Sequence, residues 1–295
     1  MKTTYKISQL FIAVFFICIS PSLTYAQDAT ASAPSKEYVR ATFENSVVLN
    51  NQTVEVTRKK SLDFMIQHRF SQIESADDLF GLYGPSNIRF GLTYGVTKFL
   101  ALGVGVTKNQ MLYDFNAAAS ILKQTKGKGS PVSVTYYGNI CRGALKDDNY
   151  LNQNGEYKAS DRLSFFNEVM IARKFNSKLS MQLGATYSHM NLVDSLYQQH
   201  DFYGVSFVGR YKFSPQSSVM IDFDYLLNVS DIDESVRPQP NMTIGYEAST
   251  GSHQFQFFVG TGTGIVGQHY RVYNTNQWND WEVVFGFNIT RIWGF

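Results

Sequence analysis

Residues 281–295, at the end of the chain, alternate between apolar and polar side chains. One face carries Trp281, Val283, Phe285, Phe287, Ile289 and Trp293, and the other carries Glu282, Gly286, Asn288 and Thr290. A period of two predicts a β-strand, because successive side chains leave a strand on opposite sides. Aromatic residues at both ends of an apolar face are typical of a strand with lipid on one side and a lumen on the other. A strand of a soluble β-sandwich can share this alternation, so the rest of the chain decides.

Eleven segments upstream repeat the alternation, and most are near the roughly 9–11 residues that a tilted membrane strand needs. They lie at about 62–70, 87–96, 100–107, 113–121, 132–140, 163–175, 179–187, 203–213, 218–227, 241–248 and 253–264. With the last segment, the pattern predicts an all-β fold. We expect a transmembrane, antiparallel, up-and-down β-barrel of about twelve strands.

The connections between these segments alternate in length. Five of them are long, at about 72–85, 142–161, 191–201, 229–240 and 265–280, and the one near 108–110 breaks the rule. The intervening connections are mostly two to four residues long, although 123–130 is longer. Long extracellular loops and short periplasmic turns are typical of outer-membrane barrels. A soluble periplasmic β-sandwich, the rival architecture, has no reason to keep this alternation.

The first 26 residues predict export. Lys2 and Lys6 precede an apolar run at 10–19, and small residues surround a cleavage site after Ala26, as in a secretory signal peptide. The run is too short to cross a membrane as a helix. Without Lys2 and Lys6 the formal charge of +2 becomes zero. We therefore expect the bacterial outer membrane as location, its lipid and the barrel-assembly machinery as partners, and no nucleic acid.

Residues 27–60 precede the barrel, which is predicted to occupy residues 61–295. The stretch 27–35 is rich in Ala, Ser, Thr and Pro and reads as a linker. Residues 47–49 and 54–56 predict a small hairpin with its turn at Asn50 and Asn51. This extension lies either in the periplasm or in the lumen as a plug. Cys141 is the one cysteine left after export, so no internal disulfide is expected.

Four stretches carry a family resemblance. They are 62–70 (LDFMIQHRF), 87–92 (NIRFGL), 171–175 (IARKF) and 286–289 (GFNI). Together they resemble a family of bacterial outer-membrane β-barrel proteins defined as a domain of unknown function, over roughly residues 42–295. The resemblance implies a barrel and an outer-membrane location, and it brings no catalytic or binding residues with it.

The candidate site is the lumen. Eight charged residues are candidates to line it: Arg69, Arg89, Glu168, Arg210, Asp222, Asp224, Glu247 and Glu282. We expect ion pairs of Arg210 with Asp222 and of Arg69 with Glu282. A barrel of twelve strands lies between small barrels filled by side chains and wide aqueous pores. The lumen is therefore either a narrow channel or carrier for small solutes, or closed, in a barrel that serves structure or surface interaction.

Two further expectations concern ion preference and assembly. Seven inward acids face four inward bases, which favours cations in a channel. The acids are Asp63, Asp114, Glu168, Asp222, Asp224, Glu247 and Glu282, and the bases are Arg69, Arg89, Arg210 and Lys212. Trp281, Phe285, Phe287 and Phe295 form the candidate assembly signal at the end of the chain.

An enzyme is not expected. Ser188, His189 and Asn191 lie together near an outer loop, which suggests a lipid-modifying site. Adjacent residues of a strand point to opposite faces, however, so Ser188 and His189 do not meet as nucleophile and base. The sequence holds no metal-ligand cluster and no nucleotide motif, so no cofactor is expected.

Overall fold

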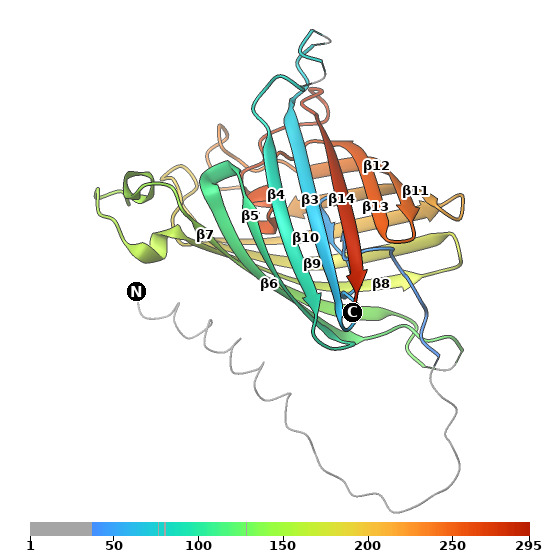
Figure 1. Ribbon diagram of the computed structural model, residues 1–295. Helices are drawn as coiled ribbons and strands as arrows, with labels where there is room; N and C mark the ends of the chain where they lie inside the picture. The colour runs from blue at the N-terminus through green and yellow to red at the C-terminus, as the bar shows by residue number, and fades with distance from the viewer. Residues whose placement is uncertain (1–36, 76, 80, 128) are drawn as a thin grey trace, which may run out of the picture. The chain divides into compact units, whose positions relative to one another are not determined.

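Twelve antiparallel strands close into a barrel in a computed structural model that describes residues 37–75, 77–79, 81–127 and 129–295 (Figure 1). The strands are β3 (Ser61–Gln72), β4 (Asn87–Gly95), β5 (Leu100–Thr107), β6 (Leu112–Leu122), β7 (Ser133–Gly143), β8 (Leu163–Lys174), β9 (Leu179–Met190), β10 (Asp201–Lys212), β11 (Ser217–Leu226), β12 (Asn241–Thr250), β13 (His253–Gly260) and β14 (Val284–Gly294). The predicted fold class is confirmed. The predicted signal peptide and the linker at 27–35 lie outside the described residues.

Each strand pairs with the next in the sequence, and β14 closes the ring on β3. Asn288 lies opposite Gln67, and Ile289 lies opposite Ile66, so polar meets polar on one face and apolar meets apolar on the other. A slip of one residue would exchange the two faces, which is why the alternation fixes the register. One irregularity, between Val284 and Gly286, interrupts this closing pair.

The two faces of the wall have the inverse polarity of a soluble protein. On the outer face Phe115 and Leu183 are 64% and 65% exposed, although both lie within strands. On the inner face Asp222 and Glu247 are fully buried. Apolar side chains outside and charged ones inside are stable where lipid surrounds the wall. The alternative architecture, a soluble β-sandwich, is therefore excluded. Among the described residues, no helix is long and apolar enough to cross a membrane.

The last strand begins later than predicted, at Val284. Trp281 has a φ of +56°, which is not a strand conformation, and Glu282 belongs to the preceding loop. The Glu282 carboxylate accepts a hydrogen bond from the Gln277 amide at 2.9 Å. The apparent alternation thus runs through a loop for its first three residues.

Loops differ between the two ends of the barrel. We call the end with the connections 73–86, 108–111, 144–162, 191–200, 227–240 and 261–283 the long-loop end, and the other the short-turn end. Three short 3-10 helices lie in these connections: η1 (Asn109–Met111), η2 (Asp147–Tyr150) and η3 (Ala159–Arg162). Loop 261–283 contains the short helix α2 (Gly267–Val272).

Candidate functional site

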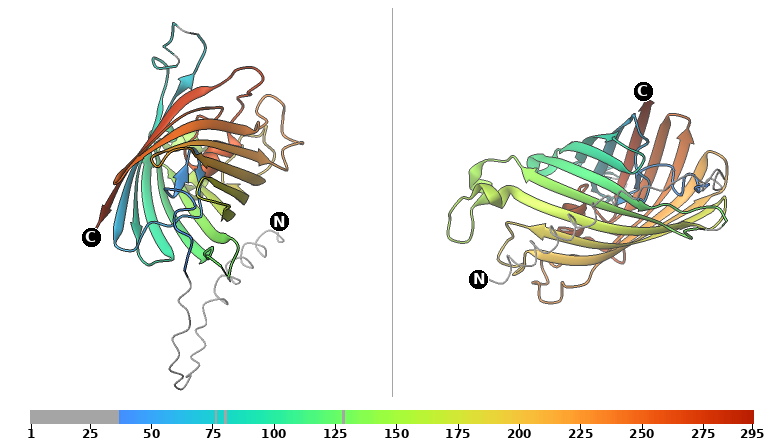
Figure 2. Two further views of the ribbon diagram at one scale, coloured as in Figure 1. Left: turned by 90° about the vertical axis from the view of Figure 1, so that its right-hand side faces the viewer. Right: turned by 90° about the horizontal axis from the view of Figure 1, so that it is seen from below.

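A hairpin from the N-terminal segment occupies the lumen. It consists of β1 (Val47–Val48) and β2 (Asn51–Gln52), and Figure 2 shows it inside the ring of strands. The pairing of Val48 with Asn51 places its turn at Leu49 and Asn50, one residue earlier than predicted. Leu49 has a φ of +55°. The sequence left two locations open for this segment, the periplasm and the lumen. In the structure it lies in the lumen.

The segment enters from the short-turn end. Lys59 bridges to Gly95, and Tyr38 bridges to Thr125, both next to short turns. At this entrance Lys126 Nζ donates to Glu37 Oε1 at 2.5 Å, and this hydrogen bond lowers the pKa of the Glu37 carboxyl.

Two glutamines of the wall bind the hairpin backbone as a neighbouring strand would. Gln182 accepts from the Val54 amide at 2.9 Å and donates to the Gln52 carbonyl at 2.7 Å. Gln256 accepts from the Leu49 amide at 3.1 Å and donates to the Val47 carbonyl at 3.0 Å. Buried backbone groups need such partners, because an unpaired one costs as much as a lost hydrogen bond.

The turn of the hairpin is held by charged groups of the wall. The Asn50 amide donates to Asp222 Oδ2 at 2.9 Å, and Asn50 Oδ1 accepts from Arg69 Nε at 3.0 Å. Closer to the short-turn end, Glu44 accepts from Arg210 at 3.0 Å and from Lys212 at 2.8 Å. Glu44, three residues before β1, therefore neutralises part of the charge on the inner face.

Apolar packing also holds the hairpin. Phe43, Val48, Leu49 and Val54 form one buried cluster with inward residues of the wall, among them Phe166, Met170, Val208, Met220 and Phe258. Gly245 makes room for the turn, because a Cβ at that position would lie 2.6 Å from Leu49 Cδ2. These bulky inward residues of the wall thus belong to the same apolar cluster as the N-terminal segment.

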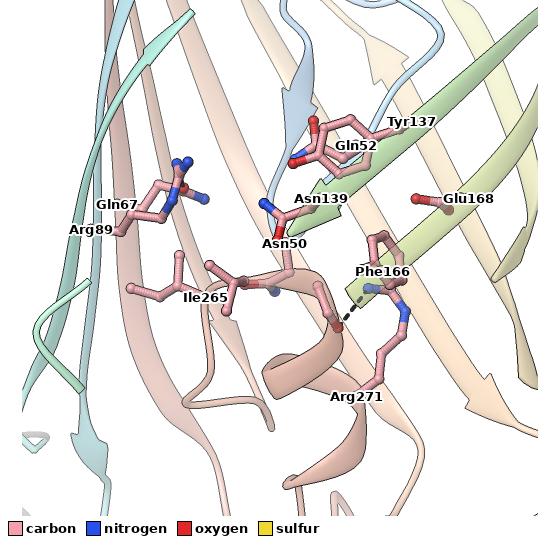
Figure 3. Close-up of a pocket in the computed structure, with 12 residues that line it drawn as sticks. Asn50, Gln52, Gln67, Arg89, Tyr137, Asn139, Phe166, Glu168, Ile265 and Arg271 are labelled. Carbon is pink, nitrogen blue, oxygen red and sulfur yellow. Dashed lines mark hydrogen bonds between the residues drawn. The ribbon is translucent and has the colours of Figure 1, made fainter. Parts of the chain in front are cut away.

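Helix α2 closes the lumen from the opposite side. Arg271 pairs with Asp224 at 2.7 Å and also donates to Asn51 Oδ1. Asn51 in turn donates to Asp224 Oδ2 at 2.8 Å. We call these three residues the central interlock, because they join hairpin, wall and helix. Arg271 also lies 4.6 Å from the centre of the Phe166 ring (Figure 3).

An apolar cluster holds α2 in place at the long-loop end. It contains Met190, Tyr197, Phe202, Leu226, Ile232 and Val272. Within α2, burial lowers the pKa of His269 to about 4, so this histidine is neutral near pH 7. Arg271 is therefore the charge that the helix brings into the lumen.

Between hairpin and helix a cavity of about 20 Å³ remains. Its lining includes Asn50, Gln67, Arg89, Asn139, Glu168 and Arg271 (Figure 3). A volume of this size has room for about one water molecule. Hairpin and helix together thus leave little space in the part of the lumen that these residues line.

Seven of the eight candidate lumen residues lie on the inner face of the wall: Arg69, Arg89, Glu168, Arg210, Asp222, Asp224 and Glu247. Arg89 makes a two-pronged contact with Asp114, at 2.8 Å for each bond. Glu168 accepts from Ser206 at 2.6 Å. Glu282 is the exception, because it lies in loop 261–283.

Both predicted ion pairs are wrong. Arg210 pairs with Glu247 at 2.7 Å and with Glu44. The register places Met220 opposite Arg210, and Asp222 lies two residues further along β11, opposite Val208. Arg69 binds Asn50 and, at 3.0 Å, Asn288, and its expected partner Glu282 is outside the barrel wall.

Gln182, Gln256, Asn51 and Arg271 are not among the residues predicted to line the lumen. The first three are neutral amides, whereas the predicted lining consists of charged residues. Arg271 falls in the connection predicted at about 265–280. An inward glutamine in the middle of a strand is the signal that could have found the hairpin's partners.

The residues of the suggested lipid-modifying site are not brought together. Ser188 is buried on the inner face, whereas His189 faces outward and contacts Asp201 Oδ1 at 2.6 Å. Asn191 donates to the Ser160 carbonyl at 2.7 Å. Among the described residues, no group of three or more His, Cys, Asp or Glu side chains is placed to hold a metal ion.

The candidate assembly residues lie at the seam of the barrel and beside it. Phe285 and Phe287 face outward, and the Phe287 ring stacks on His68 with centres 5.1 Å apart. Phe295 is 80% exposed, and its amide donates to the Lys60 carbonyl at 2.9 Å. Trp281 lies in the loop, 75% exposed.

Comparison with known proteins agrees with this architecture. The family described as "Membrane bound beta barrel domain (DUF5777)" matches residues 43–293. The COG4313 outer membrane channel from Pseudomonas putida F1 is similar in structure, with a TM-score of 0.51 and 11% identity over 81% of this chain and 98% of that one. For the KdgM porin the TM-score is 0.46, with 11% identity over 80% and 99%. No curated protein matches the chain.

Proposed function

We propose, from the premise that this chain belongs to the membrane-bound β-barrel family DUF5777, that it is an outer-membrane channel or carrier for small solutes, closed at rest by its own hairpin. The observation that carries the proposal is the way in which the wall binds the hairpin. Wall residues such as Gln182, Gln256 and Asp222 hold its backbone by hydrogen bonds. Water can replace these bonds when the hairpin leaves, because it offers the same donors and acceptors.

The wall beneath the hairpin supports a conducting state. Its inward residues include Arg69, Glu168, Asp222 and Asp224, all fully buried or nearly so. Charges taken out of water are costly unless partners replace the water. An apolar lining would fill a permanently closed barrel at lower cost, whereas a charged lining suits a lumen that is hydrated in one of its states.

We propose a modest preference for cations. Without Glu282, six of the named inward acids remain against four inward bases. The preference belongs to the unplugged lumen, since part of this charge is paired with the hairpin and α2 in the closed state.

A closed structural or surface-interaction barrel is the second candidate. The apolar cluster around Phe43, Leu49 and Phe166 favours it, because it resembles a permanent core. In either case we propose the long-loop end as the extracellular end, and we propose no catalytic step.

Conductance across a planar bilayer separates the two candidates. The full-length protein is expected to be silent, and removal of residues 27–58 is expected to open it. A variant with Asn50→Ala and Asn51→Ala loses four side-chain hydrogen bonds of the hairpin tip, to Thr243, Arg69, Asp224 and Arg271, and keeps the chain intact. Its control carries Asn152→Ala and Asn154→Ala in the surface loop 144–162.

The outcomes differ sharply. Openings in the tip variant and in the deletion, with a silent control, support the channel. If both variants fold but stay silent, the barrel is permanently closed and the channel proposal fails. In the open variant, Glu168→Gln together with Asp222→Asn is expected to reduce the preference for cations.

A further inference from the structure

The outer wall carries a hollow that the lumen does not explain. It has a volume of about 760 Å³ and extends over β3 to β8. Outward residues such as Leu92, Leu102, Phe115, Ile140 and Phe165 line it. A barrel is convex on its outer side, so a hollow of this size needs a local cause.

The register explains the hollow. Leu102 pairs with Ala117, Ala117 with Gly138, and Gly138 with Asn167, so these four residues form one row across β5 to β8. Ala117 and Gly138 are the smallest residues of the row and lie side by side. Neighbouring rows supply large side chains, and the floor formed by Ala117 and Gly138 is therefore sunk between them.

Asn167 places polar atoms on this lipid-facing surface. Its Oδ1 accepts a hydrogen bond from the Tyr136 hydroxyl at 2.5 Å. Among the described residues, its amide nitrogen has no hydrogen-bond acceptor. Asn167 has four strand residues before it and seven after it in β8, so it lies well inside the apolar band. Amide hydrogens without an acceptor are costly in hydrocarbon, and polar residues facing lipid therefore point to a function.

We propose that the hollow binds a small apolar molecule from the membrane that carries a hydrogen-bond acceptor, such as a ketone, ester or ether oxygen. The volume falls within the roughly 300–1,000 Å³ of small-molecule sites, which are mainly apolar with a few placed polar groups. The Asn167 amide donates to the acceptor, and Phe115, Ile140 and Phe165 contact the apolar body. This proposal does not depend on the proposed channel.

Two other occupants fit less well. Ester groups of bulk lipid lie at the polar interface of the membrane and do not reach a residue at this depth. A second copy of the chain in a symmetric dimer presents the same patch. Two hollows facing each other would enclose an empty space and leave both Asn167 amides without an acceptor.

The test uses an alkyl-substituted benzophenone, which is apolar, has a carbonyl acceptor and crosslinks to nearby C–H groups under ultraviolet light. The folded full-length protein in detergent micelles is irradiated with increasing probe, and mass spectrometry locates the adducts. Saturable labelling of peptides from β6 to β8 is expected. A dialkyl ketone should compete with the probe, and an alkane of matched length should not.

Two variants locate the site. Asn167→Leu removes the donor and keeps an apolar surface. It should raise the probe concentration needed for half-maximal labelling about fivefold to tenfold. Gly138→Leu fills the floor and should abolish saturable labelling. The three atoms nearest to a Cβ at Gly138 all belong to the Tyr136 side chain, the nearest at 3.1 Å, so the barrel should tolerate it. Ala185→Leu, on the outer face of β9, is the matched control.

The heat-modifiable folded form is checked for every variant before labelling. Non-saturable labelling, or equal labelling of Gly138→Leu and the control, would overturn the proposal. A dimer in sedimentation that Gly138→Leu dissociates would assign the hollow to a second copy and would overturn it as well.

Discussion

Replacing Arg271 with Met is expected to unlock the lumen. Arg271 is the residue through which α2 contacts both the hairpin and the wall, by way of Asn51 and Asp224. Met keeps much of the side-chain volume over the Phe166 ring and removes the charge. The closed state then holds Asp224 with Asn51 as its remaining donor among the described residues.

The magnitude follows from burial. Both partners of the ion pair have side chains that are at most 2% exposed. Removing one partner of a buried pair costs about 3–5 kcal/mol, because the other charge is left uncompensated. In the proposed open state the hairpin has left and water reaches Asp224, so that state escapes most of this cost. At about 1.4 kcal/mol for each factor of ten, the lower figure shifts the closed–open equilibrium by more than a hundredfold.

Single-channel recording measures this shift as the fraction of time spent open. The matched control is Arg162→Met. Arg162 is also buried, lies 4.3 Å from the centre of the Tyr150 ring and pairs with Asp147, but it belongs to the loop 144–162. It is expected to leave conductance unchanged.

A second substitution makes the reasoning refutable. Adding Asp224→Leu to Arg271→Met removes the uncompensated charge, and an apolar replacement of a buried pair is often neutral or stabilising. The double variant should therefore close again. If Arg271→Met stays as silent as the wild type while remaining folded, the interlock does not hold the lumen shut. If the double variant opens more than the single one, the cause is lost packing and not charge.

Three further outcomes are expected. Phe287→Arg should lower the heat-modifiable folded form, because a charge on the lipid face costs about 2–4 kcal/mol at mid-membrane, whereas Phe287→Leu should fold normally; deletion of Phe295 should lower that form as well, and unchanged folding of Phe287→Arg would show that this face does not meet lipid. Protease added to intact cells should cut within 144–162 and spare the turn 175–178, and cleavage only after rupture of the outer membrane would reverse the proposed orientation. Gly245→Leu should displace the hairpin tip and raise conductance, and a silent, folded variant would show that the tip can move aside.

The barrel was predictable from the sequence because each strand has one lipid face and one lumen face. In β5, for example, Leu102 and Val104 point outward while Gly103 and Gly105 point inward. The inner position of Arg69, Arg89 and Asp222 follows from the same alternation. The start of β14 was misplaced because Trp281 continues the alternation by chance inside a loop.

The partners of the charged residues were not predictable, because they depend on register and on chain segments that enter the lumen. Arg210 lies opposite Met220, and its acceptors come from β12 and from the N-terminal segment. Arg271 lies in a loop that no strand pattern describes. Pairing by proximity along one hairpin, as for Arg210 and Asp222, ignores both effects.

The neutral amides of the wall, unlike its charged residues, indicate that a chain segment lies in the lumen. A charged inward residue can be satisfied by water or by a neighbouring strand, so it does not indicate a plug. Gln182 and Gln256 each offer one donor and one acceptor to the backbone of an extended segment. Contact with water alone would not require this pairing of donor and acceptor. Glutamine also loses more rotamer freedom on burial than a small residue. Inward glutamines in the middle of strands, facing a hairpin sequence outside the barrel, therefore indicate that the hairpin lies in the lumen.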